Sequence, residues 1–445
     1  MYYKAEMWDK MQDIMSRYND HMTHGYLQFD SHLDKDILKK ALSISVDKFP
    51  LFKTKYYSGL FRATWKSLRH YNFEDCYQFV ETEGVLLEVC EKFLVTVIDE
   101  TKGPQVKFLH ARCAEKDALA ILINHQCMDG ADLRIYYKSI AEIYNDLLNN
   151  GNGDIYVKNG SRSEMQIYDQ FTPKQLEEIE GLISYSKKQK HKIAFPFEKS
   201  RKSARIAKIN KLVINASEFA KLRTNGKKLG VSVNDIVLGA FYRVATLMIK
   251  LPQGATLGLP NMINMRRYIK GGESAGFCNL TSMSVVNLNG VIGDDIFETI
   301  ARCKNSMDAL KSDYMGLHGW SLLRTVQKLI PHGIAKILIG TFFKNPLIGL
   351  SNIGIIDHES LVFGNARLEA PTYMTGSIKY PPYMQLALTT LYNEVTFTIA
   401  IKATEKDHKM FEEFFLHFGE ELRKFALAEI TDEYATQILN KANGQ

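Results

Sequence analysis

The sequence predicts an α/β fold, in the form of two α+β two-layer sandwich lobes. The chain has 445 residues, which is long for one hydrophobic core and suits two lobes of roughly 150–250 residues each. Hydrophobic residues make up 45% and charged residues 24% of the chain, as in an ordinary soluble globular protein. Helix-like and strand-like patterns occur together in both halves, which favours a sheet covered by helices in each lobe.

The first third of the chain alternates helix and strand patterns. The expected elements, in chain order, are a helix over 7–18, a helix from a cap at Asp34 to a stop at Pro50, a hairpin over 52–66 that turns at Ser58-Gly59, two strands over 105–125, and a helix from Ala131 that ends in the Asn- and Gly-rich run 149–154.

The second half repeats this style and ends in a hairpin and a helix. The expected elements are a helix over 233–248 capped by Ser232, strands over 255–265 and 281–288, a hairpin over 381–403 that turns at Asn393-Glu394, and a closing helix over 408–427.

Residues 155–205 differ in composition from both halves, because they are basic and poor in large apolar residues. We therefore expect an exposed connection at 156–205 between lobes at 1–155 and 206–445. An alternative is that its lysines, among them Lys187, Lys188, Lys190 and Lys192, form a positive entrance for an acidic or phosphate-bearing donor.

Composition also excludes several classes of protein. The net charge of +6 is mild for this length and gives no nucleic-acid-binding stripe. The start of the chain has no secretory signal pattern, and the six cysteines are scattered without a CxxC pair. We expect reduced thiols, no metal site and a cytoplasmic protein.

The most apolar stretch, 329–350, is interrupted by Pro331, Lys336 and Pro346, so a transmembrane segment is not expected. For the overlapping segment LLRTVQKLIPHGIAKILIGTFF, residues 322–343, the favoured interpretation is a pair of core helices. The alternative is a surface that lies on a membrane and serves lipid acceptors, since basic residues are inserted among the apolar ones.

A histidine, an aspartate and a glycine follow one apolar run closely. The segment ILINHQCMDGADL, residues 121–133, predicts a buried strand that ends at His125, a short loop, and a helix that begins near Asp129-Gly130. A histidine at a strand end can act as a general base near neutral pH. Asp129 can orient the imidazole, cap the helix or pair with an arginine, and Gly130 permits close approach of the backbone.

This motif resembles the HHxxxDG signature of the CoA-dependent acyltransferase superfamily, which includes chloramphenicol acetyltransferase, the condensation domains of nonribosomal peptide synthetases and alcohol acetyltransferases. Other segments are similar to that family in the same order along the chain: VSVNDIVLGAFYRVA, LPNMINMRR, GFCNLTSMSVV, GLSNIG and PPYMQLALTTLYNEVTFTI. The standalone alcohol acetyltransferase or condensation-like members are the most similar.

The resemblance implies two lobes arranged as a V around a central tunnel, which the helix pair at 322–343 would flank, with His125 as general base where donor and acceptor meet. It implies an O- or N-acyltransferase whose co-substrate is acyl-CoA or a phosphopantetheine thioester, possible binding of an acyl carrier protein, and no permanently bound cofactor. It also implies that Asp129 is chiefly structural and pairs with Arg266. A buried pair of this kind costs about 3–5 kcal/mol to break from one side.

The sequence departs from the signature at Asn124, which replaces the first histidine. Since His125 is the family's base, activity is still expected. The departure motivates an alternative, a binding or scaffold protein that keeps the fold and has lost turnover.

Further candidates are weaker. Asn279, Thr281 and Ser282 could contact the donor or an oxyanion, or could simply complete a strand end. Ser351 and Asn352 are placed near the expected tunnel, where a turn role is favoured. Cys127 is read as a small buried hydrophobe rather than a nucleophile. The remaining histidines that we considered show no metal-ligand spacing; they are His21, His24, His32, His110, His318 and His332.

Overall fold

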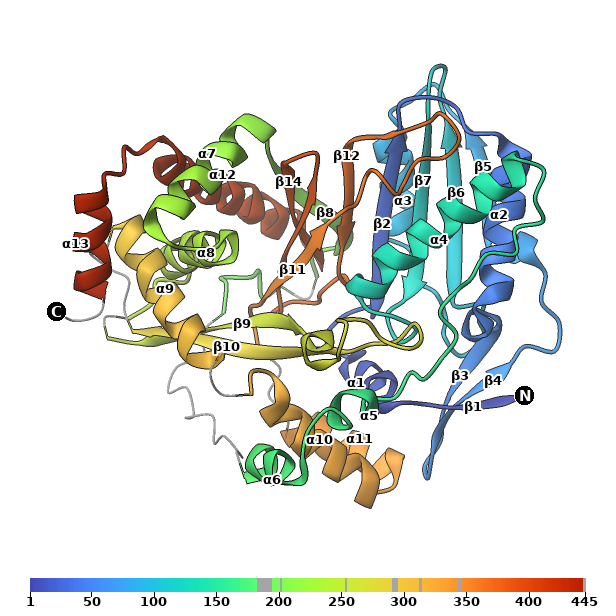
Figure 1. The fold of residues 1–445 in the computed structure, drawn as a ribbon, viewed down its shortest axis with the longest axis horizontal. Coiled ribbons are helices and arrows are strands. Elements are labelled where there is room, and N and C mark those ends of the chain that lie inside the picture. Colours follow the sequence, from blue (N-terminus) through green and yellow to red (C-terminus); the bar gives the residue numbers. More distant parts are fainter. Residues whose placement is uncertain are drawn as a thin grey trace.

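The computed structural model describes residues 1–181, 194–200, 202–252, 254–289, 295–311, 314–342 and 346–442. The predicted basic entrance at Lys187, Lys188, Lys190 and Lys192 lies outside these ranges. Two lobes lie side by side, each built on its own mixed sheet (Figure 1). The mixed α/β fold with two lobes is therefore confirmed.

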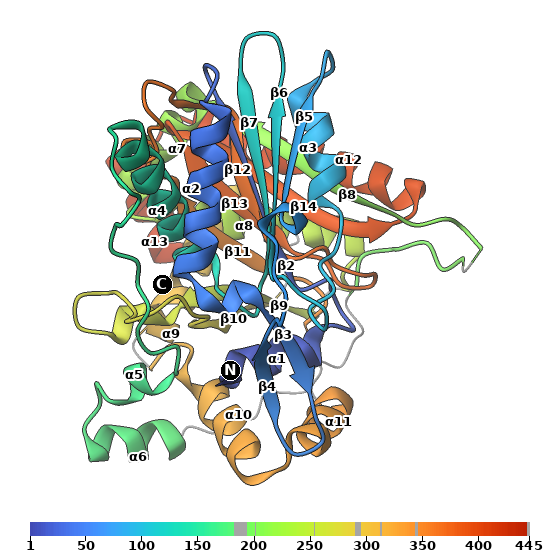
Figure 2. The same cartoon turned by 90° about the vertical axis from the view of Figure 1, so that its right-hand side faces the viewer.

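The first lobe contains a five-stranded sheet in the order β12-β2-β7-β6-β5. Its strands are β2 (Met22–Phe29), β5 (Tyr77–Glu81), β6 (Val106–Arg112), β7 (Asp117–Asn124) and β12 (Leu368–Thr375). Helices α2 (Lys35–Lys48) and α4 (Gly130–Leu148) lie over one face, and α3 (Leu86–Leu94) lies over the other (Figures 1 and 2).

Strand β7 is central in this sheet and is buried on both faces. Leu119, Ile121 and Ile123 belong to the core shared with α2 and α4. Ala120 and Leu122 belong to the core shared with α3. Side chains alternate between the two faces of a strand, so the continuous apolar run that precedes His125 follows from burial on both sides.

The second lobe contains a six-stranded sheet in the order β10-β9-β11-β13-β14-β8. Its strands are β8 (Ile206–Ile214), β9 (Thr256–Asn264), β10 (Thr281–Asn289), β11 (Leu350–Ile355), β13 (Leu386–Leu391) and β14 (Glu394–Ala403). Its helices are α7 (Ala216–Leu229), α8 (Val233–Ile249), α9 (Ile296–Lys311), α12 (Glu405–Leu427) and α13 (Asp432–Ala442).

Strand β12 corrects the predicted lobe boundary. Residues 206–445 were expected to form one lobe, but β12 crosses over and pairs antiparallel with β2, with Leu368 opposite Phe29 and Thr375 opposite His24. The other side of β2 pairs with β7. Without the crossover, β2 would be an unpaired edge strand, which proteins generally protect.

The connecting segment corrects a second expectation, because its described part is not simply exposed. It contains α5 (Met165–Tyr168) and α6 (Pro173–Gly181). Ile167, Tyr168, Ile179 and Phe195 are buried in the core of the second lobe. The basic composition of the segment predicted exposure, but these few apolar residues pack it against the second lobe.

A small sheet and three helices form one end of the molecule (Figure 2). The sheet order is β1-β4-β3, with β1 (Tyr2–Lys4) and the predicted hairpin β3 (Thr54–Ser58) and β4 (Ala63–Ser67). The helices are α1 (Met7–Met15), α10 (Leu317–Leu329) and α11 (His332–Phe342). The predicted core helix pair is only partly right, because α10 and α11 each expose apolar side chains.

Capping residues predicted from the sequence mark the observed starts of two helices. Asp34 caps α2 through Asp36 N and Ile37 N, and Ser232 begins α8 with a capping box. The β13–β14 turn comes one residue earlier than predicted, since Tyr392 and Asn393 have φ values of 47° and 63°.

Within the described ranges, no single helix is long and apolar enough to cross a membrane. Helices α7 and α8 meet the criterion together, with a bend of 101° between them. Most residues of α8 are buried in the second-lobe core, so burial inside the protein accounts for its apolar character.

Candidate active site

The predicted motif forms the connection between β7 and α4. Asn124 is the last residue of β7, Gly130 is the first residue of α4, and Asp129 is the helix cap. His125 therefore stands directly at the strand end, as expected. Its backbone N–H donates to the carbonyl oxygen of His21 at 2.8 Å, which ties the loop to the start of β2.

Asn124 holds this loop in place of the first motif histidine. Its side-chain Nδ2 donates to Gln105 Oε1 at 2.8 Å and to Gln126 Oε1 at 3.1 Å. Its Oδ1 accepts from Gln126 N at 2.9 Å. Asn124 is fully buried, and a fully satisfied buried amide rigidifies its surroundings. The substitution thus leaves a hydrogen-bonded loop.

The His125 ring is fixed through one nitrogen. Nδ1 lies 3.1 Å from the carbonyl oxygen of Met128 and 3.2 Å from Asn279 Nδ2. A carbonyl can only accept, so the Met128 contact favours the tautomer with the proton on Nδ1 and the lone pair on Nε2. In that tautomer Asn279 Nδ2, which is itself a donor, makes no hydrogen bond to Nδ1. Nε2 has no hydrogen-bond partner in the described part of the chain, and the half-buried ring keeps some accessible surface. This nitrogen is available to take a proton.

Burial lowers the pKa of His125 from its ordinary value of 6.5, and the positive charge of Lys379 lowers it further. Hydrogen bonds to the backbone and the charge of Asp129 act in the opposite direction without cancelling the effect. The ring is therefore neutral at pH 7, which is the state that a general base needs.

Lys379 is a functional candidate that the sequence reasoning missed. Its backbone N–H donates to Ala400 O and its carbonyl accepts from Lys402 N, each at 2.9 Å, so it lies against β14. Burial lowers the pKa of Lys379 to about 8, while the charge of Asp20 raises it. Lysine in a GSIKYPP loop carries no local signal, since only folding brings it to the motif.

Asp129 is fully occupied by structural contacts. Its Oδ1 accepts from Ala131 N at 3.1 Å and Asp132 N at 3.2 Å, which caps α4. Its Oδ2 accepts from Arg266 Nη1 and Leu280 N, both at 2.8 Å. Of the roles left open by the sequence, helix capping and arginine pairing are both filled. No hydrogen bond joins this carboxylate to the His125 ring among the described contacts.

Arg266 joins the two lobes through two carboxylates rather than one. Its Nη2 donates to Asp132 Oδ2 at 2.7 Å, in addition to the Asp129 contact. Asp132 also accepts from Cys278 N at 2.7 Å, and Arg266 Nε donates to Ser274 Oγ at 3.0 Å. Burial, with the Arg266 charge opposing it and the Asp129 charge adding to it, raises the pKa of Asp132, whereas Arg266 keeps that of Asp129 low.

A second arginine, Arg162, which is mostly but not fully buried, contacts the motif loop on another side. Arg162 binds both carboxylate oxygens of Asp9 at 2.9 Å and donates to the carbonyl oxygens of Gln126 at 2.9 Å and Cys127 at 3.3 Å. Sequence reasoning placed Arg162 in an exposed connection. Bidentate pairing of this kind favours a defined geometry, so Arg162 is a positioning residue of the motif loop.

Comparisons with known proteins give a fold but no sequence relative. No family model matches the chain, and no curated protein matches it in sequence. Among solved structures, the first condensation domain of the calcium-dependent antibiotic synthetase, in complex with a substrate analogue, is 11% identical and has a TM-score of 0.70, with 96% of this chain and 98% of that chain covered. The chain has the two-lobe condensation-domain fold.

Two further structures agree over nearly the whole chain. The epimerization domain from the third module of tyrocidine synthetase B is 14% identical, with a TM-score of 0.67 and 99% and 97% of the two chains covered. Polyketide synthase associated protein 5 from Mycobacterium tuberculosis is 11% identical, with a TM-score of 0.65 and 94% and 96% covered. Since proteins with different names share this fold, the fold alone does not decide the reaction.

On this condensation-domain fold, Gly130 meets the second lobe closely. A Cβ atom added at Gly130 would lie 3.1 Å from Ile353 Cγ2 on β11. The glycine has no positive φ, so close approach rather than backbone conformation explains its position.

Of the other predicted contact residues, one joins the site and two are used in the surrounding structure. Asn279 joins the site, because its Nδ2 donates to His125 O at 2.8 Å. Thr281 Oγ1 donates to Asp129 Oδ2 at 3.3 Å, and the Ser282 hydroxyl is bound to Gly316 O. Both hydroxyls are therefore used in structural hydrogen bonds at the start of β10.

Ser351 and Asn352 lie on β11 next to Ile353. Neither makes a described hydrogen bond to the motif, so a donor-contacting role stays a prediction for both. Cys127 is fully buried and burial raises the pKa of its thiol, which agrees with a structural role.

Histidines near the motif are held by the protein rather than grouped for a metal. His24 Nδ1 lies 2.8 Å from Leu94 O, and its Nε2 lies 3.7 Å from Asp20 Oδ2. His110 binds Asp117, and His332 binds Asp13. No cluster of three or more possible metal ligands occurs in the residues that the structure describes.

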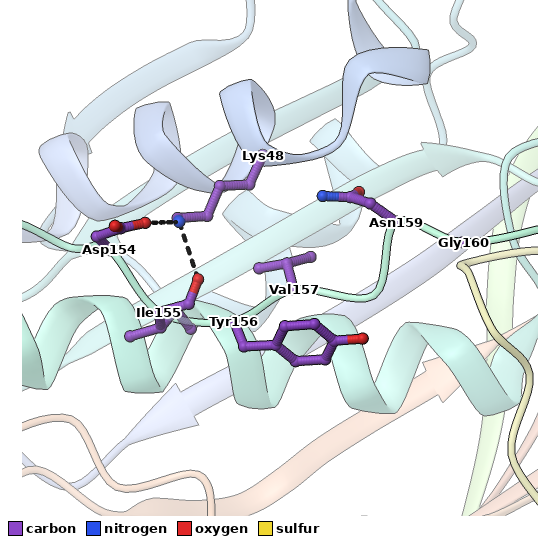
Figure 3. Close-up of a pocket in the computed structure, with 7 residues that line it drawn as sticks. All are labelled: Lys48, Asp154, Ile155, Tyr156, Val157, Asn159 and Gly160. Carbon is purple, nitrogen blue, oxygen red and sulfur yellow. Dashed lines mark hydrogen bonds and ion pairs between the residues drawn. The ribbon is translucent and has the colours of Figure 1, made fainter.

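The two described hollows lie away from His125. The larger, of about 540 Å³, is a surface groove lined by Lys48 and by residues 154–157, 159 and 160 (Figure 3). Lys48 is already paired with Asp154 at 2.8 Å. The smaller lies between α7 and Asn393. The central tunnel therefore stays a prediction.

Proposed function

We propose that the chain is an acyltransferase that moves an acyl group from a thioester donor to an alcohol or amine acceptor, with His125 as general base. The observation that carries the proposal is the neutral His125 ring, fixed through Nδ1 with Nε2 left free. The condensation-domain fold supports it, because acyltransfer is consistent with that fold.

In the proposed reaction, His125 Nε2 takes the proton of the acceptor as its oxygen or nitrogen attacks the thioester carbonyl. A tetrahedral intermediate forms, the carbon–sulfur bond breaks, and the imidazolium returns its proton to the leaving thiolate. Histidine bases of this kind contribute about 10²–10⁴-fold to the rate. The donor is acyl-CoA or a pantetheine thioester on a carrier protein, and no permanently bound cofactor is part of the proposal.

Asn279 is the best-placed residue to hold the base during this cycle. Its Nδ2 donates to the carbonyl oxygen of His125 at 2.8 Å. It also lies 3.2 Å from ring Nδ1, where no hydrogen bond forms because both nitrogens carry protons in this tautomer. It is buried, and its Oδ1 has no described partner. We assign it a positioning role through the backbone of His125, whereas the hydrogen bonds of Asp129 go to the helix cap, to Arg266 and to Leu280 N rather than to the ring.

The alternative is a catalytically impaired binding or scaffold protein, motivated by Asn124. The hydrogen bonds of Asn124 to Gln105 and Gln126 favour the enzyme over this alternative, since they keep the loop ordered.

The two functions are separated by incubating the purified chain with a panel of acyl-CoA and acyl-pantetheine donors and a small-molecule extract. Free thiol and product mass are followed for the protein and for His125→Ala. Acceptor-dependent thiol release that disappears in His125→Ala supports the enzyme. Donor binding without thiol release from any donor favours the scaffold.

A further inference from the structure

One end of the molecule exposes large apolar side chains from two segments far apart in the sequence. The tip of the β3–β4 hairpin exposes Leu60 and Phe61, with 60% and 75% of their surface accessible. Helices α10 and α11 expose Leu329, Ile334, Ile337 and Leu338. We call these six residues the apolar end surface.

Hydrogen bonds make the two segments one surface. His332 N donates to Phe61 O at 3.2 Å, and Gly333 N donates to Leu60 O at 2.7 Å, so the hairpin tip is seated on the first turn of α11. Figures 1 and 2 both show the hairpin, α10 and α11 together at one end of the molecule.

Helix α11 is apolar on two sides. Ala335 and Ile339 pack on Met11 and Ile14 of α1. Ile334, Ile337 and Leu338 follow the spacing i, i+3, i+4 and are exposed. A surface helix normally turns polar residues outward, and a contiguous exposed apolar patch marks a binding surface. Among the residues that the structure describes, none covers the outer face of α11.

The charged residues within the two segments that form this surface have one sign, although Lys336 is paired with Asp13 of α1 at 2.7 Å. Residues 54–67 and 317–342 together contain six lysines and arginines and no aspartate or glutamate. Lys55, Arg62 and Lys328 are exposed. The acidic side chains of the neighbouring α6, Glu177, Glu178 and Glu180, are exposed as well. Both views place α6 beyond α10, on the side away from the hairpin tip (Figures 1 and 2).

We infer that the apolar end surface docks on an anionic lipid membrane, with Leu60, Phe61, Ile334 and Ile337 among the acyl chains and the exposed cations at the headgroups. Apolar residues among cations, without acidic residues, are typical of segments that lie in a membrane interface. A second copy of the chain is a poorer fit, because a symmetric contact would place the same cations against one another. The inference does not depend on the chemistry at His125.

Vesicle flotation tests this inference with the full chain. We expect flotation with vesicles of phosphatidylcholine and phosphatidylserine, weaker flotation with phosphatidylcholine alone, and loss of the difference at high salt. The double variant Phe61→Glu, Ile337→Glu should lose at least tenfold in affinity. Arg62→Gln and Lys328→Gln should each lose roughly fivefold on anionic vesicles only.

The matched control is Leu247→Glu, Leu416→Glu, which changes two side chains of the second lobe with 62% and 58% exposure. Circular dichroism confirms that each variant is folded. The inference is overturned if the native chain does not float, if both double variants lose affinity equally, or if light scattering finds a dimer that Phe61→Glu, Ile337→Glu dissociates without any lipid binding.

Discussion

His125 and Asp129 lie four residues apart in one loop, yet their surroundings are opposite. His125 uses one ring nitrogen for the loop and leaves the other without a described partner. Asp129 uses both oxygens for the cap of α4, for Arg266 and for Leu280 N. The comparison teaches that one short motif combines the proposed general base with a structural joint between two lobes. The predictions below test this division.

The largest expected effect is on turnover in His125→Ala. Removing the base should lower kcat by about 10²–10⁴-fold, with the free energy of unfolding nearly unchanged, because the ring makes few structural hydrogen bonds. Steady-state kinetics and urea unfolding measure the two quantities. The control is His32→Ala, which replaces an exposed histidine and should keep native turnover. Native turnover in a folded His125→Ala variant would show that the base lies elsewhere.

Asp129→Ala should lower stability as well as turnover. It leaves a buried arginine with one of its two carboxylates, at a cost of about 3 kcal/mol or more in the free energy of unfolding. Asp308→Ala, which removes a partly exposed ion pair with Lys304, should cost less than about 1 kcal/mol. A double-mutant cycle with Arg266→Ala measures the coupling. If the losses of stability in Asp129→Ala and Arg266→Ala were strictly additive, the two residues would not be coupled across the lobes.

Lys379 should act on the pKa of His125 through its charge rather than through hydrogen bonds to the motif loop. Its charge helps to lower the pKa of His125 below 6.5, so kcat/KM should be flat at neutral pH and fall at acidic pH as the ring takes a proton. In Lys379→Met this fall should begin at higher pH, because the charge that opposes protonation is gone. Lys402→Met, an exposed neighbour, should leave the profile unchanged. An unmoved acidic limb in Lys379→Met would rule out the coupling.

The smallest effect is expected at Gly130. Gly130→Ala brings a methyl group to 3.1 Å from Ile353, which costs about 1 kcal/mol if Ile353 shifts by a few tenths of an ångström. Turnover should fall less than tenfold, and Ile353→Ala, which removes the contacting Cγ2 methyl group, should restore part of it. No rescue by Ile353→Ala would place the constraint elsewhere.

The sequence predicted the positions of the motif residues well and the residues that support them poorly. His125, Asp129, Gly130 and Arg266 carried local signals: a strand end, a helix cap, a glycine and a strand-end arginine. Asn124, which is hydrogen-bonded to Gln126, and Asp132, which is bound to Arg266, lie in the same stretch of sequence. The spacing of Asp132 from Asp129 on one helix turn could have indicated its contact. Arg162 and Lys379 gave no signal, because their partners are distant in sequence and meet only after folding.

The fold shows the same limit. Strands and helices with strong periodicity were predicted near their observed positions, because local patterning determines them. The crossover of β12 to β2 was missed, since an edge pairing between residues more than 300 positions apart leaves no local pattern. The exposed face of α11 was expected only as the alternative to a core helix pair, because an apolar residue is expected in the core when its neighbours are unknown.

The protonation state of His125 tests the central claim most directly and needs no substrate. Long-range ¹⁵N–¹H spectra of the ¹⁵N-histidine-labelled protein, assigned by comparison with His125→Gln, report the tautomer and its titration. The account predicts a neutral ring at pH 7 with the proton on Nδ1, a bare Nε2 and a pKa below 6.5. A proton on Nε2, or a charged ring at pH 7, would contradict it.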